Sequence, residues 1–143
     1  ADREEDQGEE KDKDTNDCFE WAKDHVFQVD SAPYAWLLPQ CSMMLSHGGA
    51  GVLHATLRAG IPTVISPFMG DQFFHADLVA KTGLGARAGA SLPTATQEDF
   101  VQAIASAAAC APAAQAFGEK ARSKPLGTQV LVELLEKEIV MVQ

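Results

Sequence analysis

Residues 41–72 read CSMMLSHGGAGVLHATLRAGIPTVISPFMGDQ and contain two short apolar runs, 41–46 and 63–65. Each run is followed by a loop with glycine and then by a segment compatible with a helix. The second run is β-branched and lies between Pro62 and Pro67. Short apolar strands that alternate with helices are typical of a parallel sheet with helices on both faces.

The segments on either side extend this pattern. We expect strands at 25–29 and 86–90, a short helical or irregular stretch at 34–39, and helices at 52–59, 71–82, 94–109 and 128–140. Gly60 and Gly83 are placed to end helices, and Thr94 with Gln97 fits a capping box. Pro112 should end the helix predicted at 94–109 at the latest. The last helix carries an apolar face made of Val130, Leu131, Leu134, Leu135 and Ile139. The sequence therefore predicts an α/β, Rossmann-like fold.

Charge divides the 143 residues into two parts. Residues 1–17 hold nine acids and three bases, a net charge of −6, whereas the other 126 residues carry only −3 of the total −9. No large apolar residue precedes Cys18, so we expect 1–17 to be a disordered acidic segment and 18–143 to form the domain. The segment is either a functional acidic tail or a solvated linker. The acidic balance argues against a nucleic-acid partner.

Several classes of protein are excluded by other features. The longest apolar runs fall far short of the roughly 18 residues that span a membrane, and no secretory signal is visible. The three cysteines, Cys18, Cys41 and Cys110, have neither disulfide nor metal-site spacing. We therefore expect a cytoplasmic protein without a bound metal.

The loop His47–Gly51 is the first candidate site. Ligands in such folds bind at the carboxyl ends of the strands, and glycines beside a helix start expose N–H groups to an anion. His47 can donate a hydrogen bond to phosphate; the alternative is a tight turn with a capping histidine. The loop lacks the dinucleotide spacing, because His54 stands where a glycine is needed, and it lacks the Gly-Lys pair of a P-loop.

The loop Pro67–Gln72 is the second candidate site. A carboxylate and an amide in sequence, Asp71 and Gln72, can bind vicinal hydroxyl groups. The alternative for Asp71 is a helix N-cap. A phosphate loop beside a hydroxyl-binding loop predicts a nucleotide-sugar.

Four ordered stretches within residues 25–110 resemble a known family. Segments 36–40, 47–51, 57–64 and 67–72 are similar to the donor-binding signature of UDP-sugar glycosyltransferases with the two-domain B-type fold (GT-B). The most similar branch is that of the sterol 3-β-glucosyltransferases and related lipid or macrolide transferases. The resemblance implies an inverting transfer, from UDP-glucose or another UDP-sugar, to a sterol or similar hydroxyl.

The resemblance also implies roles for individual residues. By this resemblance, the diphosphate is bound by His47, Gly49, Ala50 and Gly51. The transferred sugar is bound by Asp71 and Gln72, and the uridine by Trp36 and Gln40. Trp36 can instead be a core residue. Three positions depart from family patterns: Val52 lacks the hydroxyl often found there, Ala55 replaces the ribose-binding glutamate of the plant branch, and Ala35 replaces an acidic residue.

The resemblance places the general base outside this chain. In the family it is a histidine of an N-terminal acceptor domain. Of the histidines here, we expect His25 to be structural, His54 to face solvent or a neighbour, and His75 to be a candidate for the edge of the sugar site. No catalytic residue, metal or cofactor is therefore assigned to this chain.

The chain is short for a donor domain and is expected to be incomplete at its N-terminal side. Its expected partners are the UDP-sugar and an acceptor domain in the same or another chain, with possible membrane association of the full protein. Two alternatives remain: a donor-site subunit that works with a separate acceptor chain, or a non-catalytic interaction domain that keeps the fold.

Overall fold

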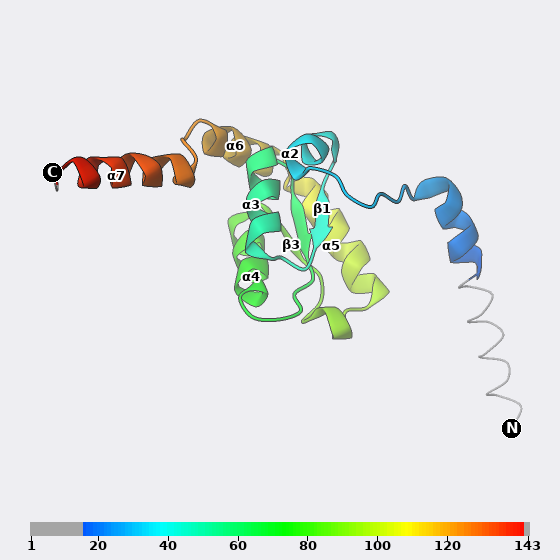
Figure 1. Ribbon diagram of the computed structural model, residues 1–143. Coiled ribbons are helices and arrows are strands. Elements are labelled where there is room, and N and C mark those ends of the chain that lie inside the picture. Colours follow the sequence, from blue (N-terminus) through cyan, green and yellow to red (C-terminus); the bar gives the residue numbers. More distant parts are fainter. Residues whose placement is uncertain (1–15, 142–143) are drawn as a thin grey trace, which may run out of the picture. The chain divides into compact units, whose positions relative to one another are not determined.

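The computed structural model describes residues 16–141 and divides the chain into two units, 1–32 and 33–143 (Figure 1). Each unit is described by itself. Of the predicted acidic segment, residues 1–15 lie outside the described part, and residues 16 and 17 begin a helix.

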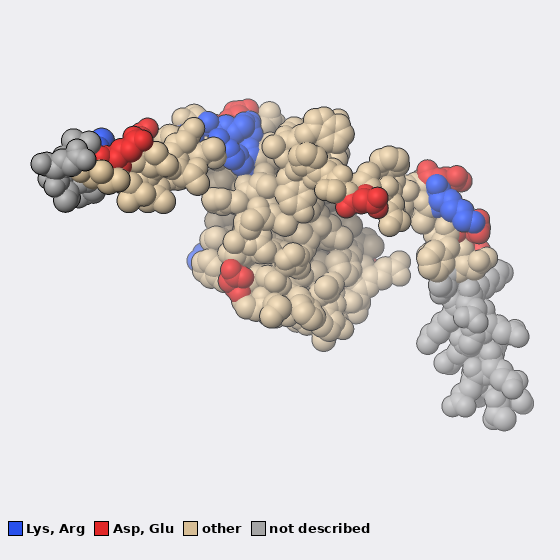
Figure 2. All heavy atoms as spheres, viewed as in Figure 1, with Lys and Arg blue, Asp and Glu red and all other residues tan. Residues whose placement is uncertain are grey.

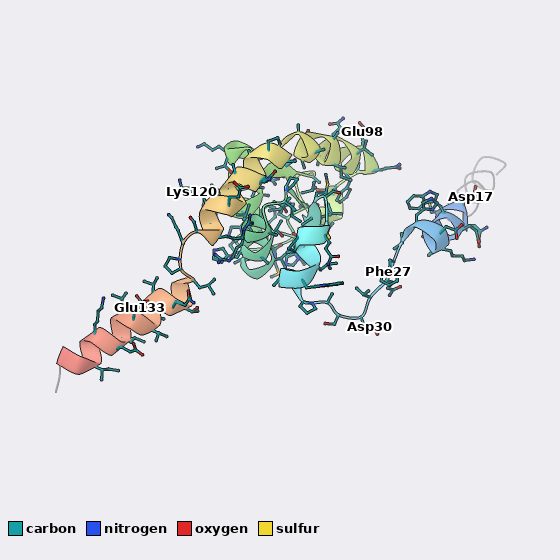
Figure 3. All side chains as sticks on the ribbon, turned by 90° about the horizontal axis from the view of Figure 1, so that it is seen from above. Asp17, Phe27, Asp30, Glu98, Lys120 and Glu133 are labelled. Atoms are coloured by element: carbon teal, nitrogen blue, oxygen red, sulfur yellow. The ribbon has the colours of Figure 1, made fainter. Side chains whose placement is uncertain are left out.

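The described part of the first unit is a helix over residues 16–25 followed by an irregular segment. His25 is the last residue of this helix, and its Nδ1 lies 2.8 Å from the Trp21 carbonyl oxygen while its ring stacks on the Trp21 indole. The strand predicted at 25–29 is therefore wrong. No strand of the described chain pairs with this segment, and Phe27 stays 90% exposed (Figure 3).

The second unit contains a parallel three-stranded sheet. β1 (Met44–Ser46), β2 (Thr63–Ile65) and β3 (Gly85–Arg87) lie in this order, with Leu45 opposite Val64 and Val64 opposite Ala86. The strand predicted at 63–65 is confirmed, the strand predicted at 86–90 forms at Gly85–Arg87, and the run 41–46 forms a strand only in its second half. Parallel strands joined by helices confirm the α/β class.

Helices cover both faces of the sheet (Figure 1). Adjacent residues of β2 point to opposite faces. Ile65 packs with Leu53 of α3 (Ala50–Ala59) and Val79 of α4 (Gln72–Thr82). Val64 packs on the other face against α5 (Gln97–Ala109). Three predicted helices are thereby confirmed, and Gly60 and Gly83 end α3 and α4 in the left-handed conformation.

A short connection precedes the sheet, as the proline-bounded stretch 34–39 predicts. α2 (Tyr34–Leu37) runs directly into a 3-10 turn, η1 (Leu38–Gln40), and both contact α3. Leu38 is the buried anchor of this connection, at 2% exposure.

The capping box of α5 lies two residues later than expected. The Thr96 hydroxyl accepts the Asp99 N–H at 3.2 Å, and the Asp99 carboxylate accepts the Thr96 N–H at 2.8 Å. Thr94 closes the 3-10 turn η2 (Leu92–Thr94) instead, through its N–H to the Ser91 carbonyl. The box predicted from Thr94 and Gln97 is wrong because Thr94 already belongs to that turn.

A further helix, α6 (Ala111–Arg122), follows α5 and was not predicted from the sequence. α6 holds Pro112 in its first turn, where the missing N–H has no helical partner to lose. Pro112 thus lies in the first turn of a new helix and follows the end of α5 at Ala109. α6 lies close against α3, since a Cβ added at Gly118 would be 2.4 Å from the Gly60 Cα.

α7 (Gly127–Met141) confirms the last predicted helix. Its apolar residues Val130, Leu131, Leu134, Leu135 and Ile139 are all exposed. Within residues 16–141, no single helix has the length and hydropathy to cross a membrane; only α5 joined to 111–137, bent by 61°, meets that criterion by length and composition.

Candidate functional site

The two candidate loops lie side by side at the carboxyl end of the sheet. β1 ends at Ser46 and β2 at Ile65, and the ladder continues one bond further, from the Ser66 N–H to the Ser46 carbonyl at 3.0 Å. The loop after β3 joins them, since the Leu92 N–H donates to the Pro67 carbonyl at 2.7 Å. The predicted phosphate and hydroxyl loops are therefore neighbours.

Gly48 fixes the course of the first loop. Its φ of +86° lies in the left-handed region, and a Cβ there would be 2.6 Å from the Ile65 Cγ2. Both of its backbone groups are bonded: its N–H donates to the Ser46 hydroxyl at 3.2 Å, and its carbonyl accepts from the His75 Nδ1 at 2.8 Å. This position is buried and allows no side chain.

His47 folds over the next glycine. A Cβ on Gly49 would be 2.7 Å from the His47 Nε2, so the absence of a side chain at Gly49 leaves room for this position of the ring, whereas its φ of −61° is ordinary. The His47 side chain is exposed. A ligand that touches the Gly49 backbone is therefore also within reach of this imidazole.

The first turn of α3 supplies hydrogen-bond donors. The first helical bond runs from the Leu53 N–H to the Gly49 carbonyl, and N–H groups 49–52 have no acceptor among the described residues. Gly49 caps the helix without a side chain. The predicted set His47, Gly49, Ala50 and Gly51 is thus brought together at one helix start, where the helix dipole favours an anion. Val52 is half-buried and adds no hydroxyl.

The second loop is held by Gln72. Its Oε1 accepts the Phe68 N–H at 2.8 Å and the Met69 N–H at 3.0 Å. Two donors on the oxygen fix the amide orientation and leave the NH₂ group to donate outward. Asp71 occupies the N-cap position of α4, but its side chain makes no capping bond. Asp71 is exposed, and it supplies an acceptor at the position before the Gln72 amide donor.

Arg87 is the cation at the end of β3, and its guanidinium is already bonded. It pairs with Asp77 of α4, donates to the Gly89 and Ala90 carbonyls, and lies 5.7 Å from the centre of the Phe73 ring. The hydrogen-bond donors in the first two loops are backbone amides and the side chains of His47 and Gln72. Within residues 16–141, no three His, Cys, Asp or Glu side chains gather as metal ligands.

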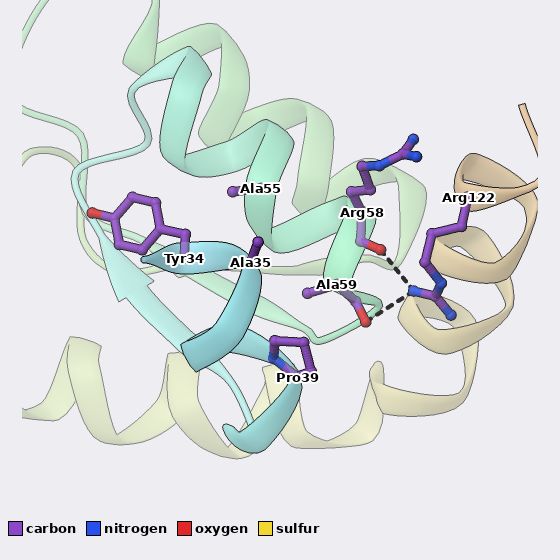
Figure 4. Close-up of a pocket in the computed structure, with 7 residues that line it drawn as sticks. All are labelled: Tyr34, Ala35, Pro39, Ala55, Arg58, Ala59 and Arg122. Atoms are coloured by element: carbon purple, nitrogen blue, oxygen red, sulfur yellow. Dashed lines mark hydrogen bonds between the residues drawn. The ribbon is translucent and has the colours of Figure 1, made fainter. Parts of the chain in front are cut away.

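A cavity of about 500 Å³ lies beside the C-terminal half of α3 (Figure 4). Its lining residues are Tyr34, Ala35, Pro39, Ala55, Arg58, Ala59 and Arg122. Arg122 closes one end by donating to the Arg58 and Ala59 carbonyls. Lys120 and Arg122 end α6, where Figure 2 shows a basic patch.

The predicted uridine residues lie next to this cavity in the chain but are not among its lining residues. Trp36 is 64% exposed, so it is not a core residue, and Gln40 donates its amide to the Trp36 carbonyl at 2.9 Å. Their role stays a prediction. Tyr34 and Arg58 also line the cavity. Neither was predicted from sequence, because the cavity exists only where α2 packs on α3.

The remaining histidines separate clearly. His25 lies in the first unit and contacts Trp21, and His54 is exposed on α3. His75 is half-buried and bonds to the glycine loop from α4. The bond from His75 to Gly48 is a contact that sequence spacing alone does not reveal, because the two residues are 27 positions apart.

The chain is similar in sequence to proteins named as sterol 3-beta-glucosyltransferases. The chain is 37% identical over 114 residues to a sterol 3-beta-glucosyltransferase of Leptosphaeria maculans, which covers 80% of this chain and 8% of that protein. It is 52% identical over 62 residues to the sterol 3-beta-glucosyltransferase UGT80B1 of Arabidopsis thaliana, covering 43% of this chain and 10% of that protein. The chain therefore spans about a tenth or less of these relatives.

Solved structures share the fold. The spinosyn rhamnosyltransferase SpnG matches with a TM-score of 0.67 and 28% identity, over 76% of this chain and 30% of that one. The glycosyltransferase VinC, solved in complex with dTDP, matches with a TM-score of 0.55 and 28% identity, over 76% and 28%. The model of the erythromycin biosynthesis protein CIII-like C-terminal domain matches residues 11–137. The chain belongs to this family, and its fold matches part of solved GT-B glycosyltransferases.

Proposed function

We propose that this chain binds a UDP-sugar, UDP-glucose in particular, as the donor half of an inverting glycosyltransferase that acts on a sterol or similar lipid hydroxyl. The observation that carries the proposal is the glycine loop. His47 and the free N–H groups at the start of α3 meet there, one loop away from Asp71 and Gln72. The names of the sterol-glucosylating relatives support the acceptor.

The diphosphate lies at the start of α3 in this proposal. N–H groups 49–52 donate to its oxygens, and His47 adds a donor from the side. Negative charge grows on the leaving UDP as the glycosidic bond to the donor sugar breaks. Donors that are already fixed in place stabilise that charge without reorganising.

The nucleoside lies along the same face of α3, towards the cavity. Gly51 and Ala55 are four residues apart, which places them on one helix face about 6 Å apart along the axis. Ala55 lines the cavity and occupies the position of the ribose-binding glutamate in the plant branch. A nucleoside diphosphate can therefore run from the cavity to the glycine loop. Trp36 and Gln40 are proposed to flank the uridine there.

The transferred sugar contacts the second loop. The Asp71 carboxylate accepts from its hydroxyls, and the Gln72 NH₂ group donates to them. The Gln72 oxygen is already bonded to the Phe68 and Met69 N–H groups, so the same residue shapes the loop and contacts the sugar.

The general base comes from an acceptor domain, in the same or another chain. It deprotonates the acceptor hydroxyl, whose oxygen attacks the anomeric carbon while the bond to UDP breaks. We therefore propose that the described residues bind the donor and stabilise the leaving group, and that turnover needs the acceptor domain. Cytoplasmic location, with the full protein at a membrane surface, stays part of the proposal.

Calorimetric titration of the full chain with UDP tests this function. We expect saturable binding, weakened about tenfold by His47→Ala through loss of one charge-assisted hydrogen bond. His54→Ala is the matched control, since His54 is exposed on α3 and lies outside the loop. Absence of binding by the wild-type chain, or equal weakening by both variants, would contradict the proposal.

A further inference from the structure

His75 joins the two halves of the candidate site. It lies one turn into α4, its backbone N–H donates to the Asp71 carbonyl at 3.0 Å, and its Nδ1 lies 2.8 Å from the Gly48 carbonyl oxygen. A carbonyl oxygen only accepts, so Nδ1 carries the hydrogen. Both the neutral Nδ1–H tautomer and the imidazolium can make this bond.

The bond restrains a peptide group that otherwise rotates easily. The Gly48–Gly49 peptide has glycine on both sides, and glycine accepts both signs of φ with little strain. The described chain has no cis peptide bond, so the Gly49 N–H points opposite to the Gly48 carbonyl. Holding the oxygen against His75 therefore turns the Gly49 N–H away from α4. That N–H has no acceptor among the described residues.

We propose that His75 is a positioning residue for the donor diphosphate. Its Nδ1–H fixes the Gly48–Gly49 peptide so that the Gly49 N–H is aimed at a phosphate oxygen before the donor arrives. The inference rests on the proposed function, because it assigns the diphosphate to this loop. This role uses Nδ1 alone, so the expectation that His75 edges the sugar site stays a prediction.

The same bond couples the two binding loops. Asp71 and Gln72 begin α4, and His75 lies three residues beyond Gln72 on that helix. The glycine loop is tied to α4 through the His75 side chain, so the diphosphate donors and the sugar-binding pair keep a fixed separation. A loosened loop therefore weakens UDP binding even though His75 itself does not touch UDP.

Three variants of the full chain test this role by titration with UDP. His75→Leu removes the donor, and we expect about tenfold weaker binding. His75→Asn keeps a side-chain N–H at nearly the position of Nδ1, and we expect affinity within about threefold of wild type. His54→Leu makes the same chemical change at an exposed site and should leave binding unchanged.

Nuclear magnetic resonance of the ligand-free chain gives a second readout. We expect His75 as the Nδ1–H tautomer or imidazolium in two-bond ¹H–¹⁵N spectra, and a shifted Gly49 amide signal in His75→Leu that His75→Asn restores. If wild type binds UDP but His75→Leu binds equally well, the inference is wrong and the proposed function stands. If His75 is the Nε2–H tautomer, the inference is also wrong. If wild type does not bind UDP, the proposed function fails and this role fails with it.

Discussion

Adjacent glycines in the first loop have different physical roles. Gly48 adopts a φ of +86° and contacts Ile65, whereas Gly49 has an ordinary φ and leaves room for the His47 ring. The sequence from His47 to Gly51 predicted a loop at the start of a helix, and α3 begins there at Ala50. The reason for each glycine became visible only with the packing of the loop on β2.

Gly48→Ala should destabilise the fold. The added Cβ meets the Ile65 Cγ2 at 2.6 Å and strains the left-handed backbone, at a cost of about 1–3 kcal/mol. Gly51→Ala is the matched control, because a Cβ there meets nothing within 4 Å and alanine favours a helix. Urea denaturation measures both. Equal stability of the two variants would refute this account of Gly48.

Asp99 should show a pH dependence set by its capping box. The Thr96 N–H and then the Thr96 hydroxyl, both bonded to the carboxylate, hold the pKa of Asp99 below its ordinary value. Folding is therefore favoured by this group above the ordinary carboxyl pKa, and that contribution is lost as pH falls through the lowered pKa.

An NMR titration of the Asp99 carboxyl carbon tests this capping box. In wild type its midpoint should lie below that of an unstructured aspartate. Thr96→Ala removes the hydroxyl, so the midpoint should move back upward and the start of α5 should become less stable. Unchanged midpoints would show that the bonds to Thr96 do not stabilise the carboxylate.

Elements with strong local signals were predictable from sequence. β2 is a β-branched run between prolines, and α3 and α4 end at glycines that adopt the left-handed conformation. α6 was missed because its buried positions are Ala114 and Gly118, which produce no apolar periodicity. Residues 25–29 misled in the opposite way, since β-rich composition forms no strand without a neighbour to pair with.

The packing of α6 on α3 depends on small residues. Gly118→Ala should separate the helices, because the new Cβ would be 2.4 Å from the Gly60 Cα, whose backbone has little room to move. We expect a loss of about 1–3 kcal/mol and a lower melting temperature. Gly127→Ala, at the open start of α7, serves as the control because nothing lies within 4 Å of its Cβ. A Gly118→Ala chain that melts no lower than this control would contradict the close packing.

At the scale of the whole molecule, the candidate site was only partly predictable. The rule that ligands bind at the carboxyl ends of parallel strands placed His47 near Asp71 correctly. The rule does not predict individual hydrogen bonds. The bond from the Phe68 N–H to the Gln72 oxygen and the bond from the His75 Nδ1 to the Gly48 carbonyl were therefore not predicted. The cavity depends on α2, α3 and α6 together, and α6 was absent from the prediction.

The last helix, α7, exposes apolar side chains. The chain covers only a small share of the length of its relatives. Leu131 is 55% and Leu135 52% exposed, on one helix face. We expect the full chain to bind the dye ANS, and Leu131→Lys with Leu135→Lys to lower the fluorescence. The control pair, Gln129→Lys with Glu133→Lys, adds more positive charge without removing apolar surface. A larger drop in this control would show that the dye does not report on the apolar face.

The most direct test of the account is a ¹H–¹⁵N titration of the full chain with UDP. The account predicts that the largest shift changes fall on the amides of Gly49, Ala50 and Gly51, with Ala55 next, while Gly118 on α6 stays unchanged. Saturation without changes at the three loop amides, or no change at any concentration, would contradict the assignment of the diphosphate to the start of α3.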